Sequence, residues 1–581
     1  MKTITSGVAV AALAMAGFTT VNADWVEESN KHAQPVLEMF AKYGPEGAGQ
    51  LGVDGYDEEI FDLKPKVFER SQADTKKVIR ELNKRLDKEK DPKVRQDLQI
   101  LLKTAEDSHY TAELNRRLML PYFNVPQTVF FGMQGLLDPR VDKSRYPAAI
   151  VRLRKYTGLE RGYEPITELA KARSSERFGV DGLIGPYREQ VEKDLQNYER
   201  FIGGIKQLLE NTELDGWQEA HAALAEQFRD YAAWMRSEML PRARDNHLLP
   251  EEVYADNLKN FGVNMDPREL MERAQFGFME IRNEMQAIAK QVARQRDYAS
   301  DDYRDVIREL KKEQLANDEL MPFYRERLVE LEEIIRNEKI VTLPERDAVI
   351  RLASEAESAA IPAPHLNPPR LIGNTGEQAE FVLPLQNPNA ASGEKMDDFL
   401  YDAVAWTLTV HEARPGHELQ FASMIEAGVS VPRAVFAFNS ANVEGWALYA
   451  EAIMKEYLPP EGQLLSLQGR LMRAARAFID PMLNLGLINP EEAKRFIMEE
   501  VVLSEPMATQ EIDRYTFRAP GQATSYYYGH MKMQSLRTRV ELALRDKFDQ
   551  QAFHDFVLAQ GLLPPELLEQ AVIQDFIPSI N

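Results

Sequence analysis

Apolar residues recur at intervals of three and four along most of the chain between Asp24 and Ala359, among Lys, Glu, Arg and Gln residues. This spacing puts the apolar side chains on one face of an α-helix, and it is clearest over residues 75–104 and 266–294. Gly and Pro residues interrupt the pattern repeatedly, as they do where one helix ends and another begins. The region 24–360 is therefore predicted to be a series of amphipathic helices.

The pattern changes at Ile361, because six prolines lie between residues 361 and 393, together with several Gly and Asn residues. Proline interrupts helices, so this segment is predicted to be loop and short strand. The best strand candidate is Ala379–Leu385, and Pro384 within it indicates a sheet edge. An edge strand can pair with an extended peptide. A plain structural hairpin explains the same residues more simply.

Helical periodicity resumes at about Lys395 and continues, with short breaks, towards the C-terminus. The region 361–581 thus combines a small β insert with further helices, and we expect it to form one continuous body with region 24–360. A chain of 581 residues can bury a large core and still shape a cleft. The predicted fold is mainly α: a large helical body with a deep cleft and a small β insert.

The first 23 residues have the pattern of a secretory signal peptide. Lys2 supplies a positive charge, an apolar stretch runs from Val8 to Phe18, and small residues precede a cleavage point after Ala23. The apolar stretch is too short to span a bilayer convincingly. We expect a periplasmic or secreted protein, cleaved near Ala23; an uncleaved amphipathic N-terminus is the alternative.

Charge and composition exclude several classes of function. The formal net charge is -22, from 70 basic and 92 acidic residues, and such a field repels nucleic acids and anionic lipid headgroups. After the first 23 residues no segment reaches about 18 uninterrupted apolar residues, so we expect no membrane insertion. The chain has no cysteine, which excludes disulfides, thiolate ligands, cysteine nucleophiles and an N-terminal lipid anchor. The sequence does not indicate an oligomeric state.

Two of the nine histidines lie in one seven-residue segment, HEARPGH, at His411 and His417. On a regular helix they would be separated by about 600° of rotation and about 9 Å of rise, so the imidazoles would diverge. Pro415 clashes with the carbonyl of His411, and Gly416 permits a backbone path closed to other residues. A broken or bulged helix would let both histidines bind one metal ion. The alternative is a kinked helix with two ordinary polar histidines.

Glu444 and Glu451 lie seven residues apart in an apolar helical run, so they share one face of that helix. Two carboxylates on such a face are costly without a cation or a partner. A zinc hydrolase needs three protein ligands and an open position for water, so Glu444 is the predicted third ligand. Glu451 is predicted to orient a ligand imidazole. Alternatively, both carboxylates pair with Arg or Lys residues of a neighbouring helix.

Three segments resemble the bacterial family catalogued as domain of unknown function 885, which is placed among gluzincin-like metallopeptidases: HEARPGHELQ (411–420), FNSANVEGWALYAE (438–451) and RYTFRAPGQATSYYYGHMK (514–532). The run 254–289 is also similar, so the resemblance covers most of the mature chain. It implies a largely helical, gluzincin-like fold and one zinc ion per chain, held by His411, His417 and Glu444. It also implies that Glu412 is the general base. Another divalent ion would satisfy the same ligands.

The resemblance places Tyr526 on the tyrosine of a PGQAxxY pattern, where a phenol would donate a hydrogen bond to the oxyanion of the reaction. Tyr527 and Tyr528 are better explained as aromatic packing. Arg514 has the planar fork that binds a carboxylate in a bidentate manner, which would favour carboxypeptidase or short-oligopeptide specificity. A buried partner for an acidic residue explains Arg514 equally well. Further candidates for the cleft are Gln420, Gln522, His530 and Lys532.

The function predicted from these residues is that of a zinc-dependent peptidase that hydrolyses short peptides. A non-catalytic periplasmic binding protein that keeps the metal is one alternative, and a zinc hydrolase of a non-peptide amide or ester is another. Glu412 separates the first two, because a structural metal site needs no base beside its ligand and fills its fourth position with protein. Zinc–water chemistry is the same for peptides and other amides, so the third possibility stays open.

Overall fold

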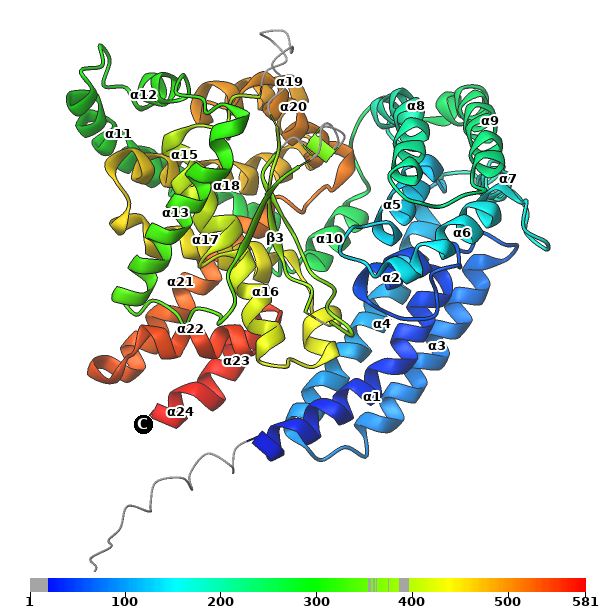
Figure 1. Cartoon of the computed structure of the whole chain (residues 1–581), viewed down its shortest axis with the longest axis horizontal. Coiled ribbons are helices and arrows are strands. Elements are labelled where there is room, and N and C mark those ends of the chain that lie inside the picture. Colours follow the sequence, from blue (N-terminus) through cyan, green and yellow to red (C-terminus); the bar gives the residue numbers. More distant parts are fainter. Residues whose placement is uncertain are drawn as a thin grey trace, which may run out of the picture.

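The computed structural model describes residues 19–353, 357–358, 361, 363–374, 376–385 and 396–580. The described part of the chain is mainly helical with one small sheet, as predicted (Figure 1). Residues 1–18, which hold most of the predicted signal peptide, lie outside it. None of the described helices is long and apolar enough to cross a membrane.

In the described part of the chain, nine α-helices form an N-terminal lobe, coloured blue to blue-green in Figure 1. They are α1 (Thr19–Tyr43), α2 (Pro45–Leu51), α3 (Val67–Leu86), α4 (Pro92–Leu118), α5 (Val125–Leu136), α6 (Pro147–Thr157), α7 (Ile166–Ser175), α8 (Arg188–Glu210) and α9 (Gln218–Trp234). Local sequence explains where several of them begin. The Asp91 carboxylate accepts hydrogen bonds from the first backbone N–H groups of α4, and Pro92 fills the first helical position, where no N–H is needed.

The remaining helices form a C-terminal body around α18. They are α10 (Glu251–Asn260), α11 (Pro267–Arg296), α12 (Tyr303–Leu310), α13 (Asn317–Asn337), α15 (Asp402–Leu408), α16 (His417–Glu426), α17 (Ser440–Met454), α18 (Pro460–Asn484), α19 (Pro490–Phe496), α20 (Glu505–Asp513), α21 (Thr524–Leu544), α22 (Gln550–Ala559), α23 (Pro565–Ala571) and α24 (Ile577–Ile580).

The hydrophobic core formed by residues 63–239 ends before α10, whereas the sequence pattern changes at Ile361. Buried residues of α10–α13 share one core with α15, α18 and α20, and α11 makes its main contact with α18. Polar contacts join the lobe to the body. The buried Asp97 carboxylate of α4 accepts from Arg433 Nε over 2.8 Å, and Lys193 of α8 pairs with Asp513 over 2.5 Å.

The sheet has the order β1-β3-β2, with β1 (Val349–Leu352) parallel and β2 (His365–Asn367) antiparallel to β3 (Glu380–Leu383). The strand expected over Ala379–Leu385 is present, but its assignment to a sheet edge is wrong because β3 is the central strand. Pro384 lies one residue beyond β3, where its missing N–H leaves the ladder intact. The edge strand β2 contacts the turn that carries His411.

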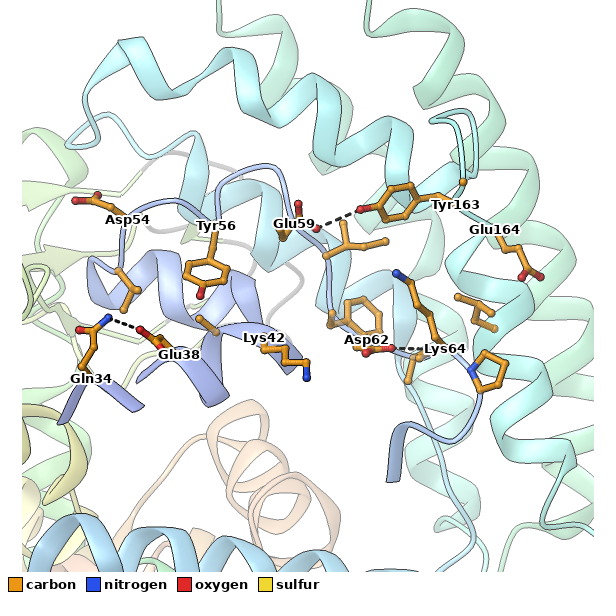
Figure 2. A pocket seen from close by; sticks show the side chains of 18 residues that line it. Gln34, Glu38, Lys42, Asp54, Tyr56, Glu59, Asp62, Lys64, Tyr163 and Glu164 are labelled. Carbon is orange, nitrogen blue, oxygen red and sulfur yellow. Dashed lines mark hydrogen bonds between the residues drawn. The ribbon is translucent and has the colours of Figure 1, made fainter. Parts of the chain in front are cut away.

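A cavity of about 800 Å³ opens in the N-terminal lobe between α1, the segment between α2 and α3, and the loop before α7 (Figure 2). Its wall is mixed in polarity, and across it Tyr163 donates to Glu59 over 3.2 Å. None of the site residues predicted from the sequence lines this cavity.

Helices α17 and α21 cross at two glycines, Gly445 and Gly529. A Cβ at Gly445 would lie 2.6 Å from the Cα of Gly529, and a Cβ at Gly529 would lie 1.9 Å from the carbonyl oxygen of Ala441. Both glycines lie on helices, where glycine is otherwise unfavourable. This close approach brings Glu444 on α17 near Tyr526 on α21.

We expect Gly529→Ala to lower the free energy of unfolding by roughly 1–3 kcal/mol, because the added methyl group meets backbone that has to shift. The control is Gly203→Ala in α8, where an added Cβ meets no atom within 4 Å. That change should stabilise the protein by roughly 0.5–1 kcal/mol, because alanine loses less conformational entropy than glycine in the interior of a helix. Urea denaturation measures both. Equal stability of the Gly529→Ala variant and the wild type would show that the two helices do not cross this closely.

Candidate metal centre

The helix that carries the HEARPGH segment is interrupted within it. Helix α15 continues into a π-helical turn over Thr409–Ala413, the Arg414–Pro415 peptide bond is cis, and α16 begins at His417. A Cβ at Gly416 would lie 1.9 Å from the carbonyl oxygen of His411, so this backbone path admits only glycine. Two successive helical segments therefore carry the two histidines.

Neighbouring helices hold the interruption in place. Trp446 Nε1 on α17 donates to the Pro415 carbonyl over 2.9 Å. Arg414 is buried; its Nε donates to Glu418 over 2.8 Å, and its Nη1 donates to Glu332 on α13 over 2.6 Å. The interruption is thus anchored by an indole on one side and by an ion-pair network on the other.

His411, His417 and Glu444 converge. One ligand atom from each lies within 4.8 Å of the other two. Glu444 Oε2 lies 3.6 Å from His411 Nε2 and 3.3 Å from His417 Nε2, and the two imidazole rings are nearly perpendicular. No group of the described residues makes a hydrogen bond of good geometry with Glu444 Oε2, although this atom is buried. A buried carboxylate oxygen without a donor, facing two imidazole nitrogens, fits a cation in the space between them.

Glu451 lies behind His411, where it was predicted to orient an imidazole. Its Oε1 is 2.6 Å from His411 Nδ1, and its Oε2 accepts from Thr407 Oγ1 over 3.2 Å. A carboxylate at Nδ1 favours the tautomer that carries its proton there, which leaves the Nε2 lone pair for a metal. Arg473 Nη2 lies 3.7 Å from the same carboxylate, so the alternative of an arginine partner for Glu451 also holds in part.

The Glu412 carboxylate lies close enough for its charge to act on His411, and it makes no ion pair or hydrogen bond with any of the described residues. The side chain is partly exposed. A carboxylate in this position is free to accept a proton from a water molecule.

Tyr526, Arg514 and Gln522 form one hydrogen-bonded group. Arg514 Nη2 donates to Tyr526 Oη over 2.8 Å, Arg514 Nε donates to Gln522 Oε1 over 2.7 Å, and Gln522 Nε2 donates to Ser440 Oγ on α17 over 2.9 Å. Burial raises the pKa of Tyr526, Arg514 opposes this, and the nearby Glu444 raises it further. Arg514 therefore holds the tyrosine beside the predicted metal ligands.

His530 and Lys532 lie on different faces of α21. Burial, followed by the charge of Arg470, lowers the pKa of His530 to about 3, so its imidazole is neutral. Lys532 Nζ lies 3.5 Å from Glu566 on α23, which also accepts from Tyr528, so this pair belongs to a contact between helices. Tyr527 packs against Gly277 on α11, in agreement with the packing role expected for it from the sequence.

Gln420 on α16 and three arginines on α18 are further polar residues near the candidate site. Gln420 Nε2 donates to Asn442 Oδ1 over 3.0 Å. Sequence reasoning missed the arginines of α18, two of which, Arg473 and Arg476, lie near the ring of Tyr526. The sequence contains a pattern that could have revealed them: α18 is otherwise largely apolar and carries arginine at every third position, at Arg470, Arg473 and Arg476. Such spacing places cations along a buried face and predicts buried anionic partners.

The comparisons with known proteins agree with this fold. The family model described as "Bacterial protein of unknown function (DUF885)" matches residues 45–572. The chain belongs to this family. None of the curated proteins compared with it matches in sequence.

Two solved structures are similar over nearly their whole length. One, described as a putative lipoprotein of unknown function from Shewanella oneidensis, has a TM-score of 0.74 at 17% identity and covers 95% of this chain and 100% of its own. The other, a putative lipoprotein from Colwellia psychrerythraea, has a TM-score of 0.74 at 19% identity and covers 96% and 99%. At this identity the likeness concerns the fold alone.

The protonation of His411 gives a test of the site. Burial lowers its pKa, but the carboxylates of Glu444 and Glu451 outweigh burial and raise it to about 9. This pKa lies above the unfolded value of 6.5. The stabilisation that protonated His411 gives the metal-free protein is therefore complete below pH 6.5 and is lost as the pH rises through about 9.

A metal competes with this proton, so we expect zinc affinity to rise about tenfold per pH unit up to about pH 9 and each zinc bound at neutral pH to release one proton. Calorimetric titration in buffers of different ionisation enthalpy measures both. In the Glu451→Gln variant the rise should end at a lower pH, because one hydrogen bond that raises the pKa of His411 is lost. Zinc affinity that is independent of pH in the wild type would contradict the assignment.

Proposed function

We propose that this protein is a zinc-dependent peptidase that hydrolyses short peptides. The observation that carries the proposal is the convergence of two imidazoles and one buried, donor-free carboxylate oxygen within 4.8 Å. The unpaired Glu412 beside them supports a catalytic site over a structural one. The order of these residues along the chain is that of gluzincin-like metallopeptidases.

The ligand set suits zinc. Two neutral imidazole nitrogens and one carboxylate are a common catalytic combination for this ion, and three protein ligands leave a position for water. A zinc ion bound here would supply a Lewis acid that polarises a peptide carbonyl and activates a water molecule.

Glu412 takes the role of general base in this proposal. It adjoins the ligand His411, and no cation of the described residues neutralises it. Its carboxylate would accept a proton from the attacking water and pass it to the leaving amine. A binding protein with a structural metal has no use for such a group, and this favours the peptidase over the non-catalytic alternative.

Tyr526 is placed to stabilise the oxygen that gains negative charge. Because its hydroxyl oxygen accepts a hydrogen bond from Arg514, its own proton remains available for donation. Arg514 is then a positioning residue that acts through Tyr526, and Gln522 fixes its guanidinium. This assigns Arg514 a different task from the substrate binding first considered for it.

An extracytoplasmic location, in the periplasm or outside the cell, belongs to the same proposal. The N-terminal pattern of a signal peptide supports it, and so does the description of two similarly folded proteins as putative lipoproteins.

Glu412→Gln should bind one zinc ion like the wild type but lose roughly 10²–10⁴-fold in kcat, because only the proton acceptor is removed. Glu444→Gln should lose zinc as well as activity, because a neutral amide is a poorer ligand. Metal analysis together with digestion of a peptide library measures both. A Glu412→Gln variant as active as the wild type would refute the general-base role. Cleavage of amide or ester model compounds but no peptides would favour the non-peptide hydrolase.

Tyr526→Phe should lower kcat by roughly 10²–10³-fold with little change in KM, because its hydroxyl acts on the transition state. The matched control is Tyr527→Phe, the adjacent tyrosine that packs against α11. That variant should keep wild-type kcat. Steady-state kinetics on one cleaved peptide compares them. An equal loss in both variants would mean that the tyrosines contribute only to packing.

A further inference from the structure

The space between α18 and α21 contains an excess of positive charge. Arg470, Arg473 and Arg476 lie at every third position of α18, and Arg514 joins them from the turn after α20. The guanidinium carbons of the last three lie 5.9, 4.6 and 5.1 Å from the centre of the Tyr526 ring. Three of the four arginines, Arg473, Arg476 and Arg514, thus gather around the tyrosine that lies beside the predicted metal ligands.

Only part of this charge is neutralised. Arg476 makes a bidentate pair with Glu511, at 2.7 and 2.8 Å, and Arg514 lies 3.5 Å from the same carboxylate. The two other arginines have no carboxylate of their own among the described residues. Arg473 shares Glu451, at 3.7 Å, with the imidazole of His411. Arg470 makes no ion pair within 4.0 Å with any described residue, and the charges of Glu451 and Glu284 act on it from further away.

Donor atoms without partners collect at the same place. The donors are Nε and Nη2 of Arg470 and Nε of Arg473, all buried and without a hydrogen-bond partner in the described part of the chain. The ring nitrogen Nδ1 of His530, a donor or an acceptor depending on the tautomer, is also buried and without a partner there. His530 lies one turn beyond Tyr526 on α21 and feels the charge of Arg470. Unpaired guanidinium groups are costly in an interior, and a cluster of unsatisfied donors indicates that an anionic group completes it.

We propose that Arg470 and Arg473 bind a carboxylate of the substrate, and that the enzyme is selective for short peptides that carry this group at or near the C-terminus. The proposal rests on the peptidase function proposed above and names its substrate class. A guanidinium fork matches a carboxylate in a bidentate manner, and the side chain of Arg473 keeps 13% of its surface exposed for such a contact.

The position of the arginines agrees with cleavage near a C-terminus. Only Glu451 separates Arg473 from the ligand His411. Arg473 Nη2 lies 3.7 Å from Glu451 Oε1, which lies 2.6 Å from His411 Nδ1. One extended residue spans about 3.5 Å, so a carboxylate held by Arg473 would lie at most about three residues from the ligand imidazole. A carboxylate held at this distance favours carboxypeptidase or dipeptidyl carboxypeptidase activity over cleavage in the middle of a long chain.

The test is binding by the zinc-loaded Glu412→Gln protein, measured by calorimetry with two acetylated tripeptides that differ only in a free or an amidated C-terminus. We expect the free carboxylate to bind about 10- to 100-fold more tightly, the range for charge-assisted hydrogen bonds. A further Arg473→Gln change should remove this difference and leave affinity for the amide unaltered. Arg473→Lys, which keeps the positive charge but loses the guanidinium fork, should keep part of the difference in affinity between the free and the amidated C-terminus.

The control is Arg495→Gln, an exposed arginine on α19, which should leave the difference intact. Zinc content shows whether each variant keeps its folded metal site. An amidated tripeptide ending in Glu distinguishes the two sources of a carboxylate: tight binding assigns the pocket to an acidic side chain, and weak binding assigns it to the C-terminus.

Equal affinity for acid and amide, or a difference that survives Arg473→Gln, would overturn the proposal. Its failure is separable from that of the proposed function. Peptide cleavage without carboxylate selectivity refutes the pocket alone. Carboxylate-selective binding by a protein that cleaves no peptide refutes the peptidase and leaves the pocket standing.

Discussion

The predicted metal centre depends on one constraint of the backbone: the chain has to leave the helical path between two histidines that are six residues apart. It does so at Gly416, where any Cβ would collide with the carbonyl oxygen of His411. The indole of Trp446 then holds the carbonyl of Pro415. Because Trp446 lies two residues after Glu444 on α17, one rigid helix both holds the interruption and supplies the third ligand. A side chain at position 416 would therefore disturb the fold and the site together.

Buried charge is the second feature that defines the site. Pairs such as Arg476 and Glu511 gain Coulomb energy, but each group loses its water, so buried ion pairs are weak evidence for stability. The arginines of the largely apolar helix α18 are therefore better explained by a role at the candidate site, near Tyr526 and Glu451, than by a gain in stability. The candidate site then brings together three predicted metal ligands, the unpaired carboxylate of Glu412 and several buried guanidinium groups.

Much of the architecture could be predicted from local pattern. The helices follow from apolar spacing with caps such as Asp91, and the strand around Phe381 follows from its composition. The place of that strand in its sheet could not be predicted, because strand order depends on residues far away in the chain, here His365–Asn367 and Val349–Leu352. The grouping of α10–α13 with the C-terminal core was hidden for the same reason, since all these helices have similar amphipathic patterns.

The sequence by itself determined two local features of the site. The helix is interrupted at Pro415–Gly416, and a seven-residue spacing puts Glu444 and Glu451 on one helix face. Both are consequences of local backbone geometry. Only the tertiary structure decided which groups meet. It turned Arg514 towards Tyr526, Lys532 towards α23 and the arginines of α18 into the interior. Those choices depend on how helices cross, and the crossing of α17 and α21 is set by contacts that no short segment contains.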